Sequence, residues 1–262
     1  PLFKIVAKYI TFKYTIVMSL QSEDLVSLLE DRLYTKEELL DLVFRVHPEY
    51  SFNSCQWVIG SLLKNNVIYS LGYGFYRLCH NRFAPFPSEM PGGKIAKLMD
   101  GSFGNVKKAM FHTSLIERLS GKSLDRKATI IEVEKDQAFG VYYELHDKLS
   151  QRMMLDPNGK EIAMYFEDNA IIIRKLFSKS PCAETGFITV EKLIVDLIAD
   201  PLFGWLYPLG DWDDLVASLI QNYDFKISTV MNYSLRRKCA ELIASLIKKH
   251  LPEDMKKIKE SF

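Results

Sequence analysis

The stretch YSFNSCQWVIGSLLKNNVIYSLGYGFYRL, from Tyr50 to Leu78, predicts a helix followed by a two-stranded hairpin. Apolar residues recur at helical spacing through its first half. The glycine-containing segment LGYG then separates two short alternating segments, VIYS and FYRL, as in a β-hairpin. The whole stretch contains no Asp or Glu. A helix and a hairpin without negative charge are what a surface that binds the phosphate backbone of duplex DNA requires.

Two more helices are predicted before this stretch. A helix over residues 22–32 is expected to begin with a Ser22 cap, and TKEE (residues 35–38) forms a capping box for a second helix. His47-Pro48 ends the second helix, because the residue before a proline is disfavoured in the α conformation. Asn53 or Ser54 is expected to cap the third helix.

Three helices that lead into a hairpin are the plan of a winged helix-turn-helix domain, predicted here for residues 19–80. The third helix would enter the major groove, and the hairpin, or wing, would contact the backbone. Residues 19–50 hold eight acidic and three basic residues, whereas residues 51–88 hold three basic residues and no acidic one. The residues predicted to contact DNA are Asn53, Ser54, Gln56, Trp57, Ser61, Lys64, Tyr73 and Arg77.

The remainder of the chain predicts a mixed α/β domain over residues 95–262, so the expected fold class is α+β. A linker is expected over residues 81–94, which contain three prolines and two glycines. Strands are predicted at ATIIEVE and AIIIRKLF, with a turn at DPNG (residues 156–159) between them. Helices are predicted from Thr189 to the Asp200-Pro201 pair, over residues 213–221, and over residues 228–250.

A second basic region lies near the C-terminus. Residues 225–250 carry six basic residues and one acidic one. Arg236, Arg237 and Lys238 are predicted to project from one helix and to contact DNA phosphates. The alternative is an ordinary solvated helix face, which is the commoner outcome for an isolated run of like charges.

An enzymatic hypothesis rests on Asp125, Glu132 and Glu134. Acidic residues two apart on a strand share a face, as in metal-dependent nucleases that bind Mg²⁺. The usual nuclease pattern has lysine where Glu134 stands, and an edge strand with charges facing solvent is the alternative. The chain shows neither a Ser/His/Asp nor a Cys/His arrangement. We therefore predict a protein that is not an enzyme, without catalytic residues, metal or cofactor.

Overall composition agrees with a protein of the reducing cytoplasm. The four cysteines are widely spaced, the formal net charge is +1, and no apolar run reaches the length needed to cross a membrane. Residues 1–18 are expected to be a leader that is vector-derived or lies upstream of a native start at Met18. No membrane partner is predicted.

Four segments after the predicted winged helix resemble, in their order, the abortive-infection type IV antitoxin family. They are MFHTSLIERLSG, IIEVEKDQAFGVYYEL, ITVEKLIVDLIADP and VMNYSLRRK, and the resemblance covers residues 20–250. It implies a repressor that binds inverted repeats upstream of its own operon. It also implies a C-terminal domain that counteracts a nucleotidyltransferase-like toxin without forming a stable complex with it.

Under this resemblance, Glu132 and Glu134 belong to a structural strand, and Arg236, Arg237 and Lys238 match the basic stretch of the family. The role of contacting DNA falls on Asn53, Gln56, Trp57, Ser61, Lys64 and Arg77. Two alternative hypotheses remain: a metal-dependent nuclease that a winged helix targets to DNA, and a winged helix that serves as a protein-docking module.

Overall fold

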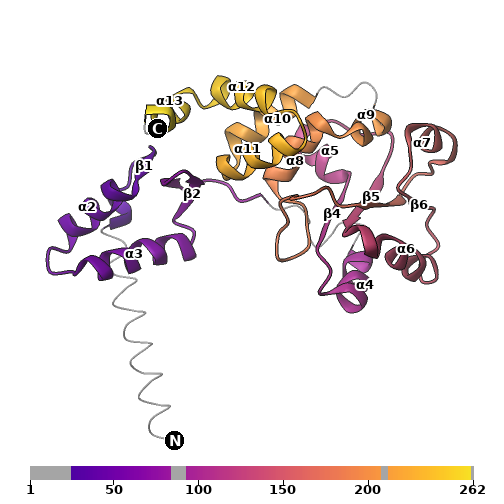
Figure 1. The fold of residues 1–262 in the computed structure, drawn as a ribbon, viewed down its shortest axis with the longest axis horizontal. Helices are drawn as coiled ribbons and strands as arrows, with labels where there is room; N and C mark the ends of the chain where they lie inside the picture. The colour runs from indigo at the N-terminus through magenta and orange to yellow at the C-terminus, as the bar shows by residue number, and fades with distance from the viewer. Residues whose placement is uncertain (1–24, 84–92, 208–211, 261–262) are drawn as a thin grey trace, which may run out of the picture. The chain divides into compact units, whose positions relative to one another are not determined.

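The computed structural model describes residues 25–83, 93–207 and 212–260, and the chain divides into two compact units, residues 1–80 and 81–262 (Figure 1). The predicted leader (residues 1–18) and residues 84–92 of the predicted linker lie outside the described residues. Both units contain helices and strands, so the fold class is α+β.

The first unit packs two helices against a small antiparallel sheet. The helices are α2 (Lys36–Val46) and α3 (Phe52–Lys64), and the strands are β1 (Tyr34–Thr35), β2 (Ile68–Gly72) and β3 (Phe75–Leu78). The strand order is β1-β3-β2, with the short β1 added to the predicted hairpin. The buried core contains Leu25, Leu29, Tyr34, Leu39, Leu40, Val43, Cys55, Ile59, Leu62 and Ile68.

Local capping signals account for where α2 begins and ends. The Thr35 hydroxyl accepts a hydrogen bond from the Glu38 backbone N–H at 3.1 Å, and the Glu38 carboxylate accepts one from the Thr35 N–H at 2.7 Å. This confirms the predicted capping box. Helix α2 ends at Val46 with His47 as its C-cap, as the His47-Pro48 pair predicts.

The expected starts and ends of the other two helices in this unit differ from the structure. Ser51, not Asn53 or Ser54, caps α3: its backbone is extended and its hydroxyl accepts the Ser54 N–H at 3.2 Å. The expected Ser22 cap lies outside the described residues, and within the described part of this segment residues 25–27 are helical and are followed by a turn. The helix does not continue to residue 32: residue 28 is in a turn, and residues 34 and 35 form β1 beside β3.

The second unit is built on a mixed four-stranded sheet. Its strands are β4 (Lys108–His112), β5 (Ala128–Val133), β7 (Ala170–Lys175) and β6 (Met153–Leu155), in that spatial order. Strand β4 is antiparallel to β5, whereas β5, β7 and β6 are mutually parallel. The strands predicted at ATIIEVE and AIIIRKLF are confirmed as β5 and β7. The expectation that β5 lies at an edge is wrong, since it pairs on both sides.

Helices cover both faces of this sheet. The helices α4 (Gly93–Phe103) and α6 (Ala138–His146) pack on the face that carries Ile131 and Val133. The opposite face carries Glu132, which contacts α8 (Val190–Ala199). The helices α10 (Trp212–Asn222) and α11 (Ile227–Arg236) pack against α8 (Figure 1). The other elements are α5 (Ser114–Ser120), η1 (Lys135–Gln137), α7 (Gly159–Tyr165), α9 (Pro201–Leu206), α12 (Ala240–His250) and α13 (Pro252–Glu260).

Several helix boundaries in this unit match the predictions and others do not. Thr189 caps α8, which ends before Asp200, and α10 covers the predicted 213–221 segment. The single helix predicted over residues 228–250 is wrong, because Lys238 has a left-handed φ of 61° and separates α11 from α12. The DPNG turn leads directly into α7, and α4 begins at Gly93, inside the segment predicted as linker.

Replacing Thr35 tests the capping box. Thr35→Ala removes the hydroxyl that accepts the Glu38 N–H, and we expect it to lower the free energy of unfolding by about 1 kcal/mol. Thr35→Ser keeps a hydroxyl and is expected to retain most of that stability. Urea denaturation followed by circular dichroism measures both. A serine variant as unstable as the alanine variant would show that the threonine methyl group, not the cap, matters.

Candidate nucleic-acid interface

The outer face of α3 carries most of the residues predicted to contact DNA. Cys55, Ile59 and Leu62 point into the core. The opposite side exposes Asn53 and Lys64, together with Trp57, whose side chain is 58% exposed. The structure therefore brings these predicted residues onto one helix face, and it leaves Ser54, Gln56 and Ser61 half-buried beside them.

Two of the half-buried polar side chains already have partners within α3. The Ser54 hydroxyl lies 2.9 Å from the hydroxyl of the cap residue Ser51. The Ser61 hydroxyl accepts a hydrogen bond from the Asn65 side-chain amide at 3.2 Å. Both hydrogen bonds stabilise an end of the helix. The two serine hydroxyls are therefore less available to a ligand than the side chains of Asn53 and Lys64.

Tyr73 occupies the tip of the hairpin. The turn consists of Tyr73 and Gly74, which have positive φ values of 56° and 82°. Two consecutive residues with positive φ form the turn that matches the twist of a hairpin, and glycine adopts this conformation without strain. The Tyr73 side chain is 45% exposed. The hairpin thus presents an aromatic side chain at its tip.

Arg77 differs from its predicted role as a backbone contact, because an acidic residue engages it. Its Nε atom lies 3.1 Å from the Asp31 carboxylate, and His80 Nε2 lies 2.9 Å from the same oxygen. The hydrogen bond from His80, and then that from Arg77, hold the pKa of Asp31 below its ordinary value although its slight burial opposes this. A phosphate would have to compete with Asp31 for Arg77.

The second basic region is divided by the break between α11 and α12. Arg236 and Lys238 are exposed, but the Arg237 side chain is only 8% exposed. Its guanidinium lies 3.6 Å from Asp196 and 3.3 Å from Asp200, and 4.6 Å from the centre of the Phe177 ring. The prediction that all three residues project from one helix is therefore wrong, and Arg237 is not placed to contact DNA.

Arg237 belongs to a buried charge network in the second unit that the sequence did not reveal. The network contains three carboxylates and three cations: Glu132, Asp196, Asp200, Arg174, Lys192 and Arg237.

Lys192 is at the centre of this network. Its ammonium lies 2.6 Å from Glu132 and pairs with Asp196 one turn along α8, with only 1% of the side chain exposed. Arg174 on β7 forms two hydrogen bonds with Asp200, at 2.9 and 3.1 Å.

Burial and neighbouring charges act against each other in this network: burial raises the pKa of Glu132, although the charges of Lys192 and Arg174 oppose this. Burial alone would lower the pKa of Lys192, but the carboxylates of Asp196 and Glu132 together raise it well above its ordinary value. The hydroxyl of Tyr233 donates a hydrogen bond to Asp196 at 2.9 Å, and Ser180 donates one to Tyr233 at 3.1 Å. Each charge thus has a partner of opposite sign, as burial of ions requires.

The same network bears on the nuclease hypothesis. Oxygen atoms of Glu132, Asp196 and Asp200 lie within 4.8 Å of one another, a spacing that suits a metal ion. The ammonium of Lys192 and the guanidinium groups of Arg174 and Arg237 already neutralise them. Glu134 follows the end of β5 and is exposed, whereas Glu132 is buried. The predicted pair of acids is therefore not brought together.

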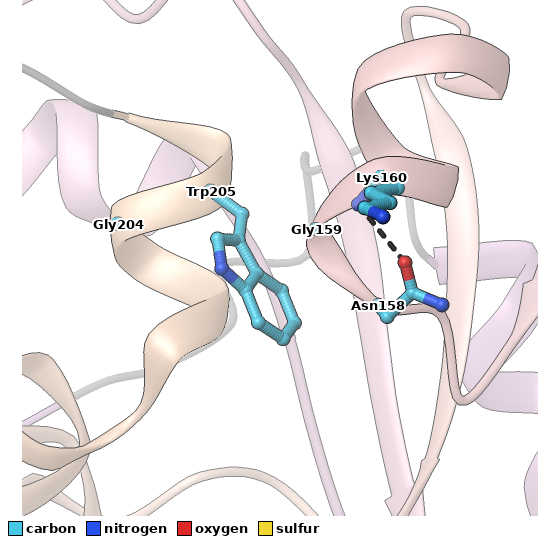
Figure 2. A pocket seen from close by; sticks show the side chains of 5 residues that line it. All are labelled: Asn158, Gly159, Lys160, Gly204 and Trp205. Carbon is cyan, nitrogen blue, oxygen red and sulfur yellow. Dashed lines mark hydrogen bonds between the residues drawn. The ribbon is translucent and has the colours of Figure 1, made fainter.

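A shallow pocket lies elsewhere in the second unit, between the start of α7 and α9 (Figure 2). Its walls are Asn158, Gly159 and Lys160 on one side and Gly204 and Trp205 on the other. The Asn158 side chain caps α7 by accepting the Lys160 N–H at 2.9 Å. Gly159 allows the indole to approach, since a Cβ atom there would lie 2.9 Å from Trp205 Nε1. The pocket thus reflects close packing of two short helices.

Residues 54–253 match a family of unknown function, DUF6577. The chain belongs to this family. The matched segment includes most of α3, the hairpin and every member of the buried charge network. No curated protein and no solved structure is significantly similar to the chain. Among the residues that the structure describes, no helix is long and apolar enough to cross a membrane.

Removing the central cation tests the network. Lys192→Met leaves Glu132 and Asp196 buried without their shared partner, and we expect it to lower the free energy of unfolding by about 3–5 kcal/mol. The matched control is Lys175→Met, which breaks an exposed ion pair with Asp156 (2.8 Å) and should cost less than about 1 kcal/mol. Chemical denaturation compares the two, and equal losses would contradict the role of Lys192.

Proposed function

We propose that this protein is a DNA-binding transcriptional repressor whose first unit is a winged helix-turn-helix domain. In this proposal α3 enters the major groove and the β2–β3 hairpin is the wing. The observation that carries the proposal is the exposed polar face of α3, which bears Asn53, Trp57 and Lys64 in a segment free of acidic residues. Asn and Gln side chains bind adenine edges, and lysine neutralises phosphate.

The distribution of charge supports this orientation. The acidic residues of the first unit precede α3, and three of them (Glu37, Glu38 and Asp41) lie on α2. A duplex would be repelled by that surface and would approach the α3 side. Because Asp31 forms an ion pair with Arg77, the first unit offers few cations to a DNA duplex. Strong DNA binding needs more phosphate contacts than these cations can make. Arg236 and Lys238 of the second unit, both exposed, are the proposed additional contacts.

The resemblance to type IV antitoxins extends the proposal to the second unit. On that basis the operator consists of inverted repeats upstream of the protein's own operon, and the protein counteracts a nucleotidyltransferase-like toxin in the cytoplasm. This part of the proposal rests on the resemblance alone. Co-expression with a neighbouring nucleotidyltransferase-like gene tests it: growth should be restored by the full chain without co-purification of the two proteins.

A protein-docking role is the second candidate function. It is favoured by three exposed aromatic side chains of the first unit, Phe52 (54%), Trp57 (58%) and Tyr73 (45%). Aromatic residues are enriched at protein interfaces. The two functions predict different results. A docking module would show no affinity for DNA but would co-purify with a partner.

Fluorescence anisotropy with a duplex of the protein's own upstream region tests the repressor proposal. A scrambled duplex is the control, and both are measured at two salt concentrations. We expect tighter binding to the upstream region and an affinity that falls as salt rises, because cations of the protein release phosphate counterions. Equal binding to both duplexes, or none, would favour the docking function.

Two substitutions on α3 separate phosphate contacts from base contacts. Lys64→Ala should weaken binding to every sequence alike and reduce the slope of log affinity against log salt by about 1. Gln56→Ala should mainly reduce the preference for the upstream region over the scrambled duplex. Anisotropy titrations at several salt concentrations measure both effects. If neither variant differs from the wild type, α3 does not contact DNA.

Substitutions in the second unit test its proposed DNA contacts in the same way. The double variant Arg236→Ala/Lys238→Ala removes two exposed cations, and we expect it to reduce the salt slope by about 2 without changing the unfolding midpoint. Arg237→Ala should instead destabilise the fold, because it leaves Asp196 and Asp200 with fewer buried partners. Thermal unfolding and anisotropy distinguish the two variants. Unchanged DNA affinity of the double variant would confine the interface to the first unit.

A further inference from the structure

Helix α6 of the second unit buries one side and exposes aromatic residues on the other. Ala138, Val141 and Leu145 belong to the core that α6 forms with the sheet and α4 (Figure 1). The outward side carries Phe139 and Tyr143, which are 61% and 62% exposed. Among the exposed large hydrophobic residues that the structure describes, these are the one pair separated by a single helical turn. Aromatic residues that gather on an exposed face are typical of interfaces.

This pair belongs to a longer stripe with the spacing of a helix–helix seam. Asp136 precedes Phe139 by three residues, and His146 follows Tyr143 by three. Asp136 lies in η1, which leads directly into α6, and side chains three apart are neighbours in both kinds of helix. All four residues are exposed. Their intervals of three, four and three residues are those of the a and d positions along which two helices pack.

Contacts within one copy of the chain already orient two members of the stripe. The Tyr142 ring meets the Tyr143 ring edge to face, with 5.5 Å between centroids, and stacks on the His146 ring at 5.7 Å. The Nδ1 atom of His146 lies 3.9 Å from the Asp147 carboxylate. Side chains that are held in place before binding lose less entropy when a partner arrives.

The order of side chains makes the stripe complementary to itself in the antiparallel direction. Asp136 stands at one end, His146 at the other, and the two aromatic rings lie between them. When two copies of the stripe run in opposite directions, Asp136 of each copy faces His146 of the other, and Phe139 faces Tyr143. In the parallel direction the two Asp136 carboxylates would face each other, which their like charge disfavours. Self-complementarity is the requirement for a contact with two-fold symmetry.

We propose that a second copy of this chain packs on α6, with the two stripes antiparallel about a two-fold axis. The contact lies outside the residues proposed to bind DNA, and it goes beyond the repressor function because it forms without DNA. Two copies related by a two-fold axis would also match an operator made of inverted repeats.

The size of the contact predicts a weak dimer. A Phe or Tyr buries roughly 150–250 Å², so the exposed parts of four such residues, two from each copy, supply on the order of 500 Å². Stable interfaces bury about 1,200–2,000 Å² in total, and smaller ones belong to transient contacts. We therefore expect the dimer to dissociate in the micromolar range.

Sedimentation equilibrium of the full chain without DNA tests this proposal. The average mass of the wild type should rise from that of a monomer towards that of a dimer as the concentration passes through the micromolar range. Phe139→Lys should weaken this association by about tenfold or more, because it places a charge at the centre of the seam in both copies. Met164→Lys is the matched control. Met164 is 71% exposed on α7, outside the stripe, and the same change there should leave the association unchanged.

An exchange of charges tests the antiparallel direction. His146→Glu places a carboxylate opposite Asp136 of the other copy and should weaken the dimer. The double variant Asp136→Lys/His146→Glu restores opposite charges at both ends and should recover the wild-type association. In a parallel arrangement the double variant would bring like charges together and would not recover it. All the substituted residues are exposed, so each variant should keep the unfolding midpoint of the wild type.

The outcomes separate the dimer from the function proposed above. A wild type that stays monomeric at every concentration, or a dimer that Phe139→Lys leaves intact, would overturn the α6 contact. A dimer that Phe139→Lys breaks and the double variant fails to restore would overturn the antiparallel arrangement. Because no DNA is present, these results leave the repressor function untouched, and a failure to bind DNA would leave the dimer standing.

Discussion

The second unit depends on the ion pairs that the buried ammonium group of Lys192 forms with two carboxylates. This group connects Glu132 on the central strand β5 with Asp196 on α8, and so it fixes the helix against the sheet. Arg174 and Arg237 extend the same network to β7 and to the break between α11 and α12. A buried charge is costly without a partner, and a set of three carboxylates and three cations provides partners for all of them.

This network also decides which charges remain on the surface. Arg237 points into the unit, so the neighbouring Arg236 and Lys238 are the members of the basic run that face solvent. In the first unit, Asp31 engages Arg77 in a comparable way. A count of basic residues along the chain therefore overstates the cations available to a polyanion. The proposed interface relies more on the shape and polarity of α3 than on net positive charge.

The sequence predicted the features that depend on neighbours along the chain. The capping box of α2, the Gly-containing hairpin, the two apolar strands and the start of α8 follow from residues a few positions apart, and the structure contains them. Where several local signals compete, the prediction was less accurate: Ser51, Asn53 and Ser54 are all good caps, and Ser51 is the one that caps α3. The break at Lys238 was missed because apolar spacing continues across it.

The buried network could not be predicted, because its members are distant in the sequence. Glu132 meets a lysine 60 residues later (132 to 192). Lys192 and Asp196 lie at i and i+4 on α8, outside its apolar stripe, so they look like a solvent-exposed pair until the helix is seen to be buried on nearly all sides. For the proposed interface, the sequence identified Asn53, Trp57 and Lys64 as exposed on α3. The half-burial of Gln56 and Ser61 and the pairing of Arg77 with Asp31 required the three-dimensional arrangement.

The position of Arg237 has a consequence for the order of events during synthesis. Its partners, Asp196 and Asp200, lie about 40 residues earlier in the chain, and the network joins strands to helices across 105 residues (132 to 237). Domains generally fold as units as they leave the ribosome, so the first unit can form while the second is still incomplete. The second unit reaches charge balance only after residue 237 has emerged. A nascent chain therefore passes through a stage in which its N-terminal unit is folded and Asp196 and Asp200 still lack one of their counter-ions.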